Sequence, residues 1–456
     1  MEMAVDELTA FLSEHPGIRY VLPSASEFSE YSTVFTQPTN TSPSAVLRPT
    51  TIQDVAEAVS FLAANAIEFT VRAGGHDMWG RGIKDGTVAL DLRLLNQVRL
   101  DQETSTARIG GGTLQGDVVT TLQQDGYMTP VGTIATVGYV GWAMYGGYGP
   151  YCPVFGLGVD QIVGAKVVTA AGEVVDADGE LLKAIKGAGG AFGVVVEVTI
   201  KTYKLNQIFA GTIIYNSDDL GSTIQQFSRG YETLKAEERI PPPLSLQSAI
   251  IKAPNPTLVV LFVWASADTQ AGREWLDKIS SLNPVVATTV QPTTPTAWLA
   301  DAAQFALATT RGGVYTVNLK SITDEVAAVM ARYALSIPRD PHTFWGLHEL
   351  RGGTVSAQFK ADAVFAAREG HLIFEILAIA ESEENLDEVL AWGRNFQRAL
   401  LATERKNIVP ASYLSFMRRE EVDRGKAFEE EDLVLLRRVK ERVDPQNVFC
   451  NAISYI

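Results

Sequence analysis

The sequence VRAGGHDMWG, from Val71 to Gly80, combines residue types that can hold an anionic ligand. Gly74 and Gly75 can adopt positive φ, so several main-chain N–H groups can converge on one anion, most usefully a pyrophosphate. Arg72 adds a permanent positive charge. His76 follows at the lip of the loop, where its imidazole can reach whatever the loop holds. The alternative is a surface turn with a solvated histidine, because so short a motif often arises by chance.

A second set of polar residues lies in the segment GHLIFEI, residues 370–376. His371 and Glu375 are four residues apart and therefore share one face of a predicted strand. They are acid/base candidates if that face meets a cofactor. The alternative is a solvated face, where such residues are usually found. No spacing of ligand residues resembles a zinc or iron site, so no metal is expected.

Residues 130–160 contain many glycines among apolar residues such as Val137 and Trp142. Each glycine costs about 1 kcal/mol inside a helix, so this segment is not expected to form a regular core element. Its apolar content is too high for an exposed loop. Main chain pressed closely against a flat ligand explains both properties.

The composition limits the class of protein. A chain of 456 residues is too long for one hydrophobic core, so two domains or one large discontinuous domain are expected. A net charge of −15, from 38 basic and 53 acidic residues, argues against nucleic acids and anionic membranes as partners. The two cysteines, Cys152 and Cys450, make no disulfide framework. No signal peptide or membrane-spanning run is evident, so a cytoplasmic location is expected.

The pattern of predicted helices and strands differs between the first and second halves of the chain. Helices are predicted at 3–14, 51–66 and 114–126, and strands at 45–49, 68–71, 161–178 and 192–205. After about residue 206, strand-like runs alternate with helical runs. That pattern predicts an antiparallel sheet with helices on one face and an α+β fold class overall.

Taken together, these motifs resemble those of flavoprotein oxidases with the vanillyl-alcohol-oxidase (PCMH) type of FAD-binding domain. Within that family the chain is most similar to the berberine-bridge-enzyme-like and 6-hydroxynicotine-oxidase-like branch. The resemblance covers nearly the whole chain and rests on the order of VRAGGHDMWGR, GYMTPVGTIATVGYVG, GVDQIVGAKVVTAAGEVV, KGAGGAFGVVVEVTI, FAAREGHLIFEI and VDPQNVF. It implies an FAD domain of two α/β subdomains at 1–205, a substrate domain at 206–407, and a segment at 408–456 that returns to the FAD domain.

The resemblance also implies roles for individual residues. His76 occupies the position that bonds to the flavin 8α-methyl carbon. The other cofactor contacts that it implies are Arg72, Ala73, Gly74, Gly75, Gly132, Thr133, Thr136, Val137, Gly138, Gly141, Gly190, Val194 and Asn451. Tyr413 is the implied catalytic base, and its alternative role is packing or hydrogen bonding. As a base it needs a neighbouring cation or the flavin to stabilise its phenolate.

Several positions depart from the family pattern. Ile134 stands where many relatives have a cysteine bonded to the flavin, and Cys152 lies too far along the chain to replace it, so a single covalent link is expected. The asparagine of the Tyr-x-Asn signature is Ser415, the usual His-Arg pair reads Ala367 and Arg368, and Met78 replaces an aromatic residue. These changes lie on the substrate side.

The expected activity is that of an FAD-dependent oxidase acting on a mid-sized organic molecule, with hydride transfer to flavin N5 and O2 as the acceptor. Val137 matches a position where oxidases of the family keep a small residue for oxygen access. The alternative is a redox-neutral isomerase or cyclase in which the flavin is structural or absent. A third class, a small-molecule binding protein without catalysis, fits the intact histidine loop least well.

Overall fold

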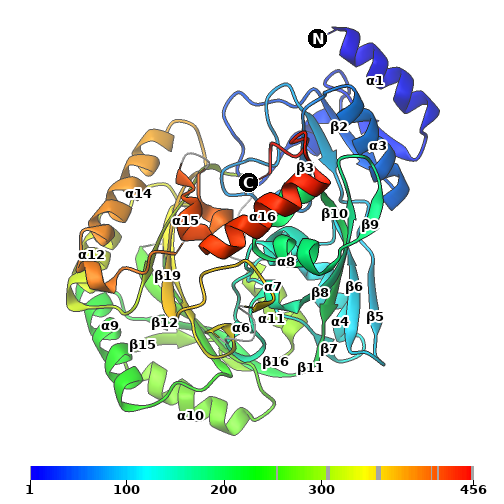
Figure 1. Ribbon diagram of the computed structural model, residues 1–456. Helices are drawn as coiled ribbons and strands as arrows, with labels where there is room; N and C mark the ends of the chain where they lie inside the picture. The colour runs from blue at the N-terminus through cyan, green and yellow to red at the C-terminus, as the bar shows by residue number, and fades with distance from the viewer. Residues whose placement is uncertain are drawn as a thin grey trace.

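The computed structural model describes residues 2–252, 255–303, 309–355, 361–411, 413–418, 421–452 and 456, and three large β-sheets organise them (Figure 1). The first sheet has the order β1-β2-β4-β3, with parallel pairing among β2, β4 and β3. The strands are β1 (Ile18–Val21), β2 (Ala45–Pro49), β3 (Phe69–Arg72) and β4 (Val88–Asp91), and the helices are α1 (Glu2–Glu14), α2 (Phe28–Ser32) and α3 (Ile52–Ala64). Thr51 and Asp54 form a capping box that begins α3.

The second sheet is antiparallel, with the order β5-β6-β10-β8-β9. Its strands are β5 (Val98–Asp101), β6 (Thr106–Gly110), β8 (Ile162–Val168), β9 (Val174–Asp176) and β10 (Val194–Lys201). The associated elements are α4 (Gln115–Gln123), α8 (Gly179–Ala188), the 3-10 helix η1 (Gly189–Phe192), and the short pair β7 (Tyr127–Met128) and β11 (Tyr203–Lys204).

The glycine-rich segment is more regular than its composition suggested. It forms three short helices, α5 (Tyr139–Met144), α6 (Cys152–Phe155) and α7 (Gly158–Gln161), so the expectation of no regular element was wrong in part. The reason is where the glycines fall. Gly146, Gly147 and Gly156 have positive φ and lie between the helices, where they allow sharp turns.

The third sheet has eight strands in the order β15-β12-β14-β13-β18-β19-β17, with β16 beside β12. They are β12 (Ile208–Tyr215), β13 (Leu244–Lys252), β14 (Pro256–Trp264), β15 (Val285–Thr288), β16 (Gln291–Thr293), β17 (Arg311–Leu319), β18 (Phe344–Leu350) and β19 (His371–Ala380). Helices α9 (Leu220–Glu237), α10 (Thr269–Ser280), α12 (Asp324–Leu335) and α14 (Leu386–Leu401) lie along its outer side (Figure 1). The predicted antiparallel sheet with helices on one face is therefore confirmed.

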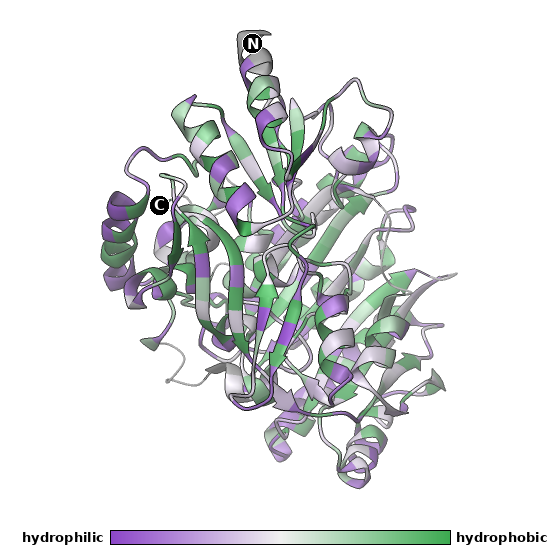
Figure 2. Cartoon of the chain, turned by 90° about the vertical axis from the view of Figure 1, so that its right-hand side faces the viewer, coloured by the Kyte–Doolittle hydropathy of each residue, from purple (hydrophilic) through white to green (hydrophobic). Residues whose placement is uncertain are grey.

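Alternation along β19 shows which side chains face away from those helices. Leu372, Phe374 and Ile376 pack with α12 and α14 in one hydrophobic cluster. The intervening residues point to the opposite face, where Ile373 packs with Tyr413. Hydrophobic residues gather along the strands in Figure 2, and hydrophilic ones on the outer helices.

The C-terminal residues lie against the first two sheets. After α11 (Pro295–Ala302) and the 3-10 helices η3 (Gly352–Val355), η4 (Arg405–Asn407) and η5 (Leu414–Phe416), the chain ends with α15 (Arg424–Ala427) and α16 (Glu430–Val443). Helix α16 runs beside α8 (Figure 1), and the Phe449 ring packs edge-on against Phe69 with centroids 5.9 Å apart. The division into domains at residues 205 and 407 stays a prediction.

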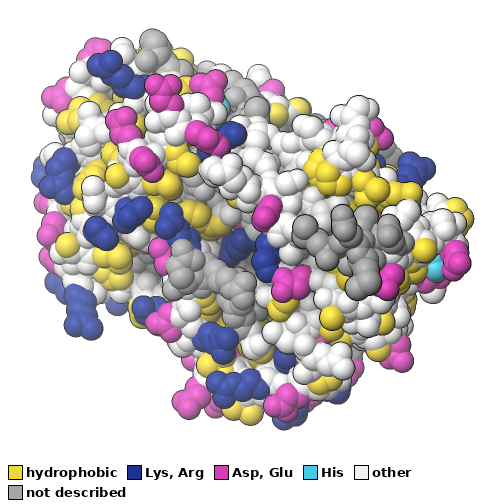
Figure 3. Space-filling model, turned by 90° about the horizontal axis from the view of Figure 1, so that it is seen from above, with side chains coloured by type: hydrophobic (Ala, Val, Ile, Leu, Met, Phe, Trp, Pro, Cys, Tyr) yellow, Lys and Arg dark blue, Asp and Glu magenta, His cyan; other side chains and the backbone are white. Residues whose placement is uncertain are grey.

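The face of the molecule shown in Figure 3 carries acidic and basic side chains intermingled. Among the described residues, no helix is both long and apolar enough to span a bilayer.

Candidate active site

Three guanidinium groups, of which that of Arg72 is buried, lie around the start of the histidine loop. Arg72 ends β3 and donates to the Tyr31 carbonyl at 2.6 Å. The buried Asp91 carboxylate pairs with Arg93 at 2.7 Å and with Arg48 at 3.4 Å. Burial, followed by the charge of Arg93, lowers the pKa of Arg72 to about 10. Three cations beside one anion leave an excess of positive charge, which favours a negatively charged ligand.

Two loops meet here by their main chains. A Cβ on Gly74 would lie 2.2 Å from the Gly138 nitrogen, so neither residue can carry a side chain without moving the other loop. Gly75 has φ of +76°, in the region that favours glycine. The contact brings the main chains of residues 72–76 and 132–141 together, and cofactor binding by these residues stays a prediction.

Two buried donors in this region lack an acceptor within the described part of the chain. They are Nε of Arg72 and Nε2 of Gln115, whose Oε1 accepts from the Gly132 main chain at 2.6 Å. Buried donors usually have partners. A ligand with many acceptor oxygens, as FAD is, satisfies such groups, so the residues present fit FAD.

The His76 ring lies flat against another ring. Its centroid is 4.5 Å from that of Phe35, with 18° between the planes. Burial, followed by the charge of Arg72, lowers the pKa of His76 to about 4. The imidazole is therefore neutral at physiological pH, and one of its nitrogens has a free lone pair.

The cysteine expected to be a packed thiol is one. Cys152 is buried and donates to the Gly147 carbonyl at 3.4 Å. Burial raises its pKa, which keeps it as an unreactive thiol. At the position where many relatives have a second flavin bond, Ile134 has no group that can bond to flavin.

Three other predicted cofactor residues are tied to protein atoms. The Gly190 N–H donates to the Tyr145 hydroxyl at 3.2 Å. The Val194 side chain is buried in the core of the first sheet, which leaves only its main chain for a ligand. Asn451 donates to the Phe69 carbonyl at 3.0 Å and accepts from Lys84 at 3.1 Å, so its amide fastens the tail to β3. Cofactor contact by Asn451 stays a prediction.

The remaining predicted cofactor residues lie on the two loops themselves. Thr133 donates to Gln247 of β13 at 3.0 Å, which joins the loop before α5 to the third sheet. Gly141, within α5, has open space where a Cβ would be. Thr136 is exposed and Val137 half-buried, and Ala73 precedes the paired glycines.

Polar residues gather on the face of the third sheet that its helices leave open. His348 of β18 lies opposite Gln247 of β13, and its Nε2 is 3.5 Å from the Glu375 carboxylate of β19. A cavity lined by Tyr148, Cys152, Gln247 and His348 adjoins them. Glu375 was a candidate from the sequence, whereas His348 lies on another strand and only strand pairing brings the two together.

His371 shares this face but not this site. Four residues of strand place it about 13 Å from Glu375 along β19. Its Nδ1 lies 2.7 Å from the Glu369 carbonyl, and burial lowers its pKa. The prediction that the two act on the same chemistry is not supported by their separation.

Tyr413 is buried in an aromatic cluster. Its ring packs edge-on against Tyr148, with centroids 4.6 Å apart, and against Phe416 at 4.7 Å. Burial raises its pKa above the ordinary value, and the charge of Glu375 raises it further. The raised pKa keeps the phenol protonated at physiological pH.

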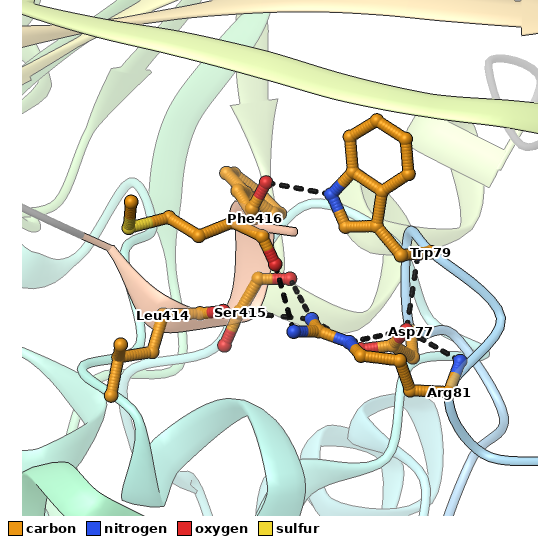
Figure 4. A network of polar contacts seen from close by, with 7 residues as sticks. Asp77, Trp79, Arg81, Leu414, Ser415 and Phe416 are labelled. Carbon is orange, nitrogen blue, oxygen red and sulfur yellow. Dashed lines mark hydrogen bonds and ion pairs between the residues drawn. The ribbon is translucent and has the colours of Figure 1, made fainter. Parts of the chain in front are cut away.

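The histidine loop also holds the turn that follows Tyr413 (Figure 4). Arg81 pairs with Asp77 at 2.7 Å and reaches across to main-chain carbonyls of that turn. Trp79 donates from its indole nitrogen to another. The accepting carbonyls, at 2.8 to 3.0 Å, belong to Ser415, Phe416 and Met417. The two candidate reactive segments are thus fixed relative to each other.

Comparison with known proteins agrees with this geometry. Residues 43–178 match the FAD binding domain family model. The FAD-linked oxidoreductase aurO of Gibberella zeae is 30% identical over 447 residues, covering 97% of this chain and 86% of that protein.

Solved structures share the fold. The 6-hydroxy-D-nicotine oxidase of Arthrobacter nicotinovorans superposes with a TM-score of 0.83 at 24% identity, covering 96% of this chain and 98% of that one. The glucooligosaccharide oxidase of Acremonium strictum, described with a 6-S-cysteinyl, 8α-N1-histidyl FAD, gives 0.81 at 18% identity, with 98% and 99% covered. The predicted fold class is confirmed, and the chain belongs to the family of FAD-linked oxidoreductases.

Proposed function

We propose that this enzyme is an oxidase of a mid-sized, specialised organic metabolite, with its FAD bonded once to the protein through His76. The observation that carries the proposal is a neutral His76 beside two glycine loops, the second of which bonds through Thr133 to Gln247 on the polar face that also bears His348 and Glu375. Bound FAD would supply the redox chemistry by accepting a hydride at N5 and passing two electrons to O2, which yields H2O2.

Different residues suit the pyrophosphate and the flavin ring of FAD. The excess of guanidinium charge around Arg72 suits the pyrophosphate, and the N–H groups of Gly74 and Gly75 suit its oxygens. The neutral His76 nitrogen is the nucleophile for the 8α carbon. Ile134 supplies no sulfur, which supports a single link in contrast to the doubly bonded flavin named for the glucooligosaccharide oxidase.

The proton that leaves the substrate goes to Glu375. A tyrosine acts as a base only as phenolate, and even an ordinary pKa of about 10 leaves roughly one phenolate in a thousand at pH 7. Burial reduces that fraction for Tyr413 further. Glu375 is a ready acceptor, and His348 at 3.5 Å can share the proton. Tyr413 then orients the substrate as a hydrogen-bond donor.

The use of O2 rests on Val137 and on the oxidases among the fold relatives. Val137 is half-buried in the second glycine loop, and a small side chain at that position suits the access of a diatomic molecule. A cytoplasmic location stays a proposal of the same kind.

One test addresses the cofactor. The purified protein is precipitated with acid, and flavin is measured in the pellet and in the supernatant. Flavin that stays in the pellet of the wild type and moves to the supernatant in His76→Ala supports the link. Flavin in both supernatants refutes the link and leaves the FAD-linked family assignment intact.

A second candidate function is a redox-neutral isomerisation. A protonated Tyr413 near the Glu375 carboxylate forms an acid and base pair that could move a proton across a substrate without net oxidation. Oxygen uptake distinguishes the two candidates. One O2 consumed and one H2O2 formed per turnover eliminates the isomerase, whereas turnover without oxygen uptake eliminates the oxidase.

A further inference from the structure

The orientation of the His76 ring depends on Phe35. Within the described part of the chain, no hydrogen bond holds the imidazole nitrogens of His76, so the stack at 4.5 Å and 18° is the contact that sets its plane. A covalent bond to a flavin carbon needs one nitrogen lone pair aimed at that carbon. The residue that fixes the ring plane therefore affects the reaction without taking part in it.

The main chain of Phe35 is fixed from two sides. Its N–H donates to the Gly75 carbonyl at 2.9 Å, which ties it to the histidine loop. Its carbonyl accepts from the Thr310 N–H at 2.7 Å, and the Gln37 N–H donates to the Thr310 carbonyl at 2.8 Å. Thr310 directly precedes β17 of the third sheet. Phe35 is thus held between the cofactor loop and the substrate-side sheet.

The side chain of Phe35 also has little room to turn. It packs on a cluster of buried Met78, Val314 and Ile379, of which the last two come from β17 and β19. Both the main chain and the ring of Phe35 thus depend on the third sheet being in place. The third sheet, which faces the substrate, therefore also determines the orientation of His76, the residue proposed to bond to the flavin.

We propose that Phe35 is the positioning residue for covalent flavin attachment, and that it makes attachment depend on the docking of the third sheet. The inference rests on the proposed link through His76. In that step an imidazole nitrogen bonds to the 8α carbon, and the methyl C–H and imidazole N–H bonds break. The two hydrogens and their electrons leave the flavin ring reduced, and O2 then takes them as H2O2.

The expected effect follows from the strength of the stack. An aromatic pair contributes about 0.5 to 1.5 kcal/mol beyond its buried area, and about 1.4 kcal/mol is a factor of ten in rate. Phe35→Leu should therefore slow attachment about two- to tenfold while non-covalent FAD binding is kept. Phe35→Met is a second variant that lacks the ring, and Phe35→Tyr keeps it.

The chain offers a matched control. Phe11 stacks on His15 in the same way, with centroids 4.0 Å apart and 29° between planes, in the N-terminal helix. Phe11→Leu removes an equivalent phenylalanine–histidine stack away from the cofactor loops.

The experiment measures the rate of attachment. Each protein, made under riboflavin limitation, is incubated with FAD, and acid-stable flavin is followed by in-gel fluorescence beside total bound flavin. Slower attachment in the Leu and Met variants, at wild-type total flavin, with normal rates in Phe35→Tyr and Phe11→Leu, supports the proposal. Wild-type attachment rates in the Leu and Met variants overturn the proposed role of Phe35 and leave the proposed His76 link standing. A wild type without acid-stable flavin overturns the His76 link and this inference together.

Discussion

Replacing Arg368 by methionine will leave a carboxylate in the protein interior without its cation. Arg368 donates to the two carboxylate oxygens of Asp160 at 2.6 and 2.9 Å, and the side chains are only 6% and 1% exposed. Breaking such a buried pair from one side costs about 3 to 5 kcal/mol, because the remaining charge has lost its water and its partner. The free energy of unfolding should fall by that amount.

The assay is urea unfolding followed by tryptophan fluorescence. The midpoint should drop in Arg368→Met with an unchanged slope, which marks a change in stability alone. Asp160→Asn removes the charge and keeps an oxygen to accept from the Leu157 N–H, which now donates to Asp160 at 2.8 Å. The double variant should lose less than the sum of the two single losses, since each single change strands the other partner.

An exposed pair provides the control. Arg438 and Glu180 join α16 to α8 with 59% and 45% of their side chains exposed. Arg438→Met should cost no more than about 1 kcal/mol. If Arg368→Met costs as little as Arg438→Met, water reaches Asp160 in the folded protein and the reasoning from burial is wrong.

Three further predictions concern the cofactor loop and the groups around it. Before flavin is attached, burial lowers the pKa of His76 from 6.5 to about 4. The unfolded chain therefore binds more protons than the folded chain in that window, and stability falls by about 1.4 kcal/mol per unit as the pH drops through it. Urea midpoints of apo-protein should show this slope relative to His76→Asn, and equal slopes would contradict it. Glu375→Gln should slow anaerobic flavin reduction about 10²- to 10⁴-fold, as loss of a general base does. Tyr413→Phe should slow it less than about tenfold, as loss of one hydrogen bond does, and the reverse order would make Tyr413 the base. Lys440→Met, made in a His76→Ala background, should weaken FAD binding in a fluorescence titration. It removes the cation 2.6 Å from the buried Asp444 carboxylate and a bond to η1. An unchanged Kd would show that the Lys440 contacts with η1 and Asp444 do not support FAD binding.

Local chemistry made the cofactor loops predictable from the sequence. Paired glycines after a strand, with an arginine before and a histidine after them, suit an anion but also occur in surface turns, and the resemblance to a known family favoured the first interpretation and added their partners. The period of two along β19 correctly placed Glu375 and His371 on one face of a strand, although the sequence left open which face it was. In each case the signal lay within a few residues.

Features made by distant segments could not be predicted in this way. Phe35 lies in a polar stretch, and nothing near it in sequence indicates a partner 41 positions later. Gln247 and His348 become neighbours only through the register of β13 and β18. Tyr413 was chosen by its position in a motif, but the burial that keeps it protonated is a property of the packed cluster.

The tail has a consequence for how the protein is made. Asn451 and Phe449 fasten onto Phe69, in the strand that leads into the cofactor loop, across 382 residues of chain. Ribosomes add about 5 to 20 residues per second, so about 20 to 80 s separate the synthesis of the two partners. During that interval β3 has been synthesised but lacks its contacts with Phe449 and Asn451. The strand before the cofactor loop therefore completes its packing only at the end of translation, and mutations of Phe449 or Asn451 should disturb that strand from the far end of the chain.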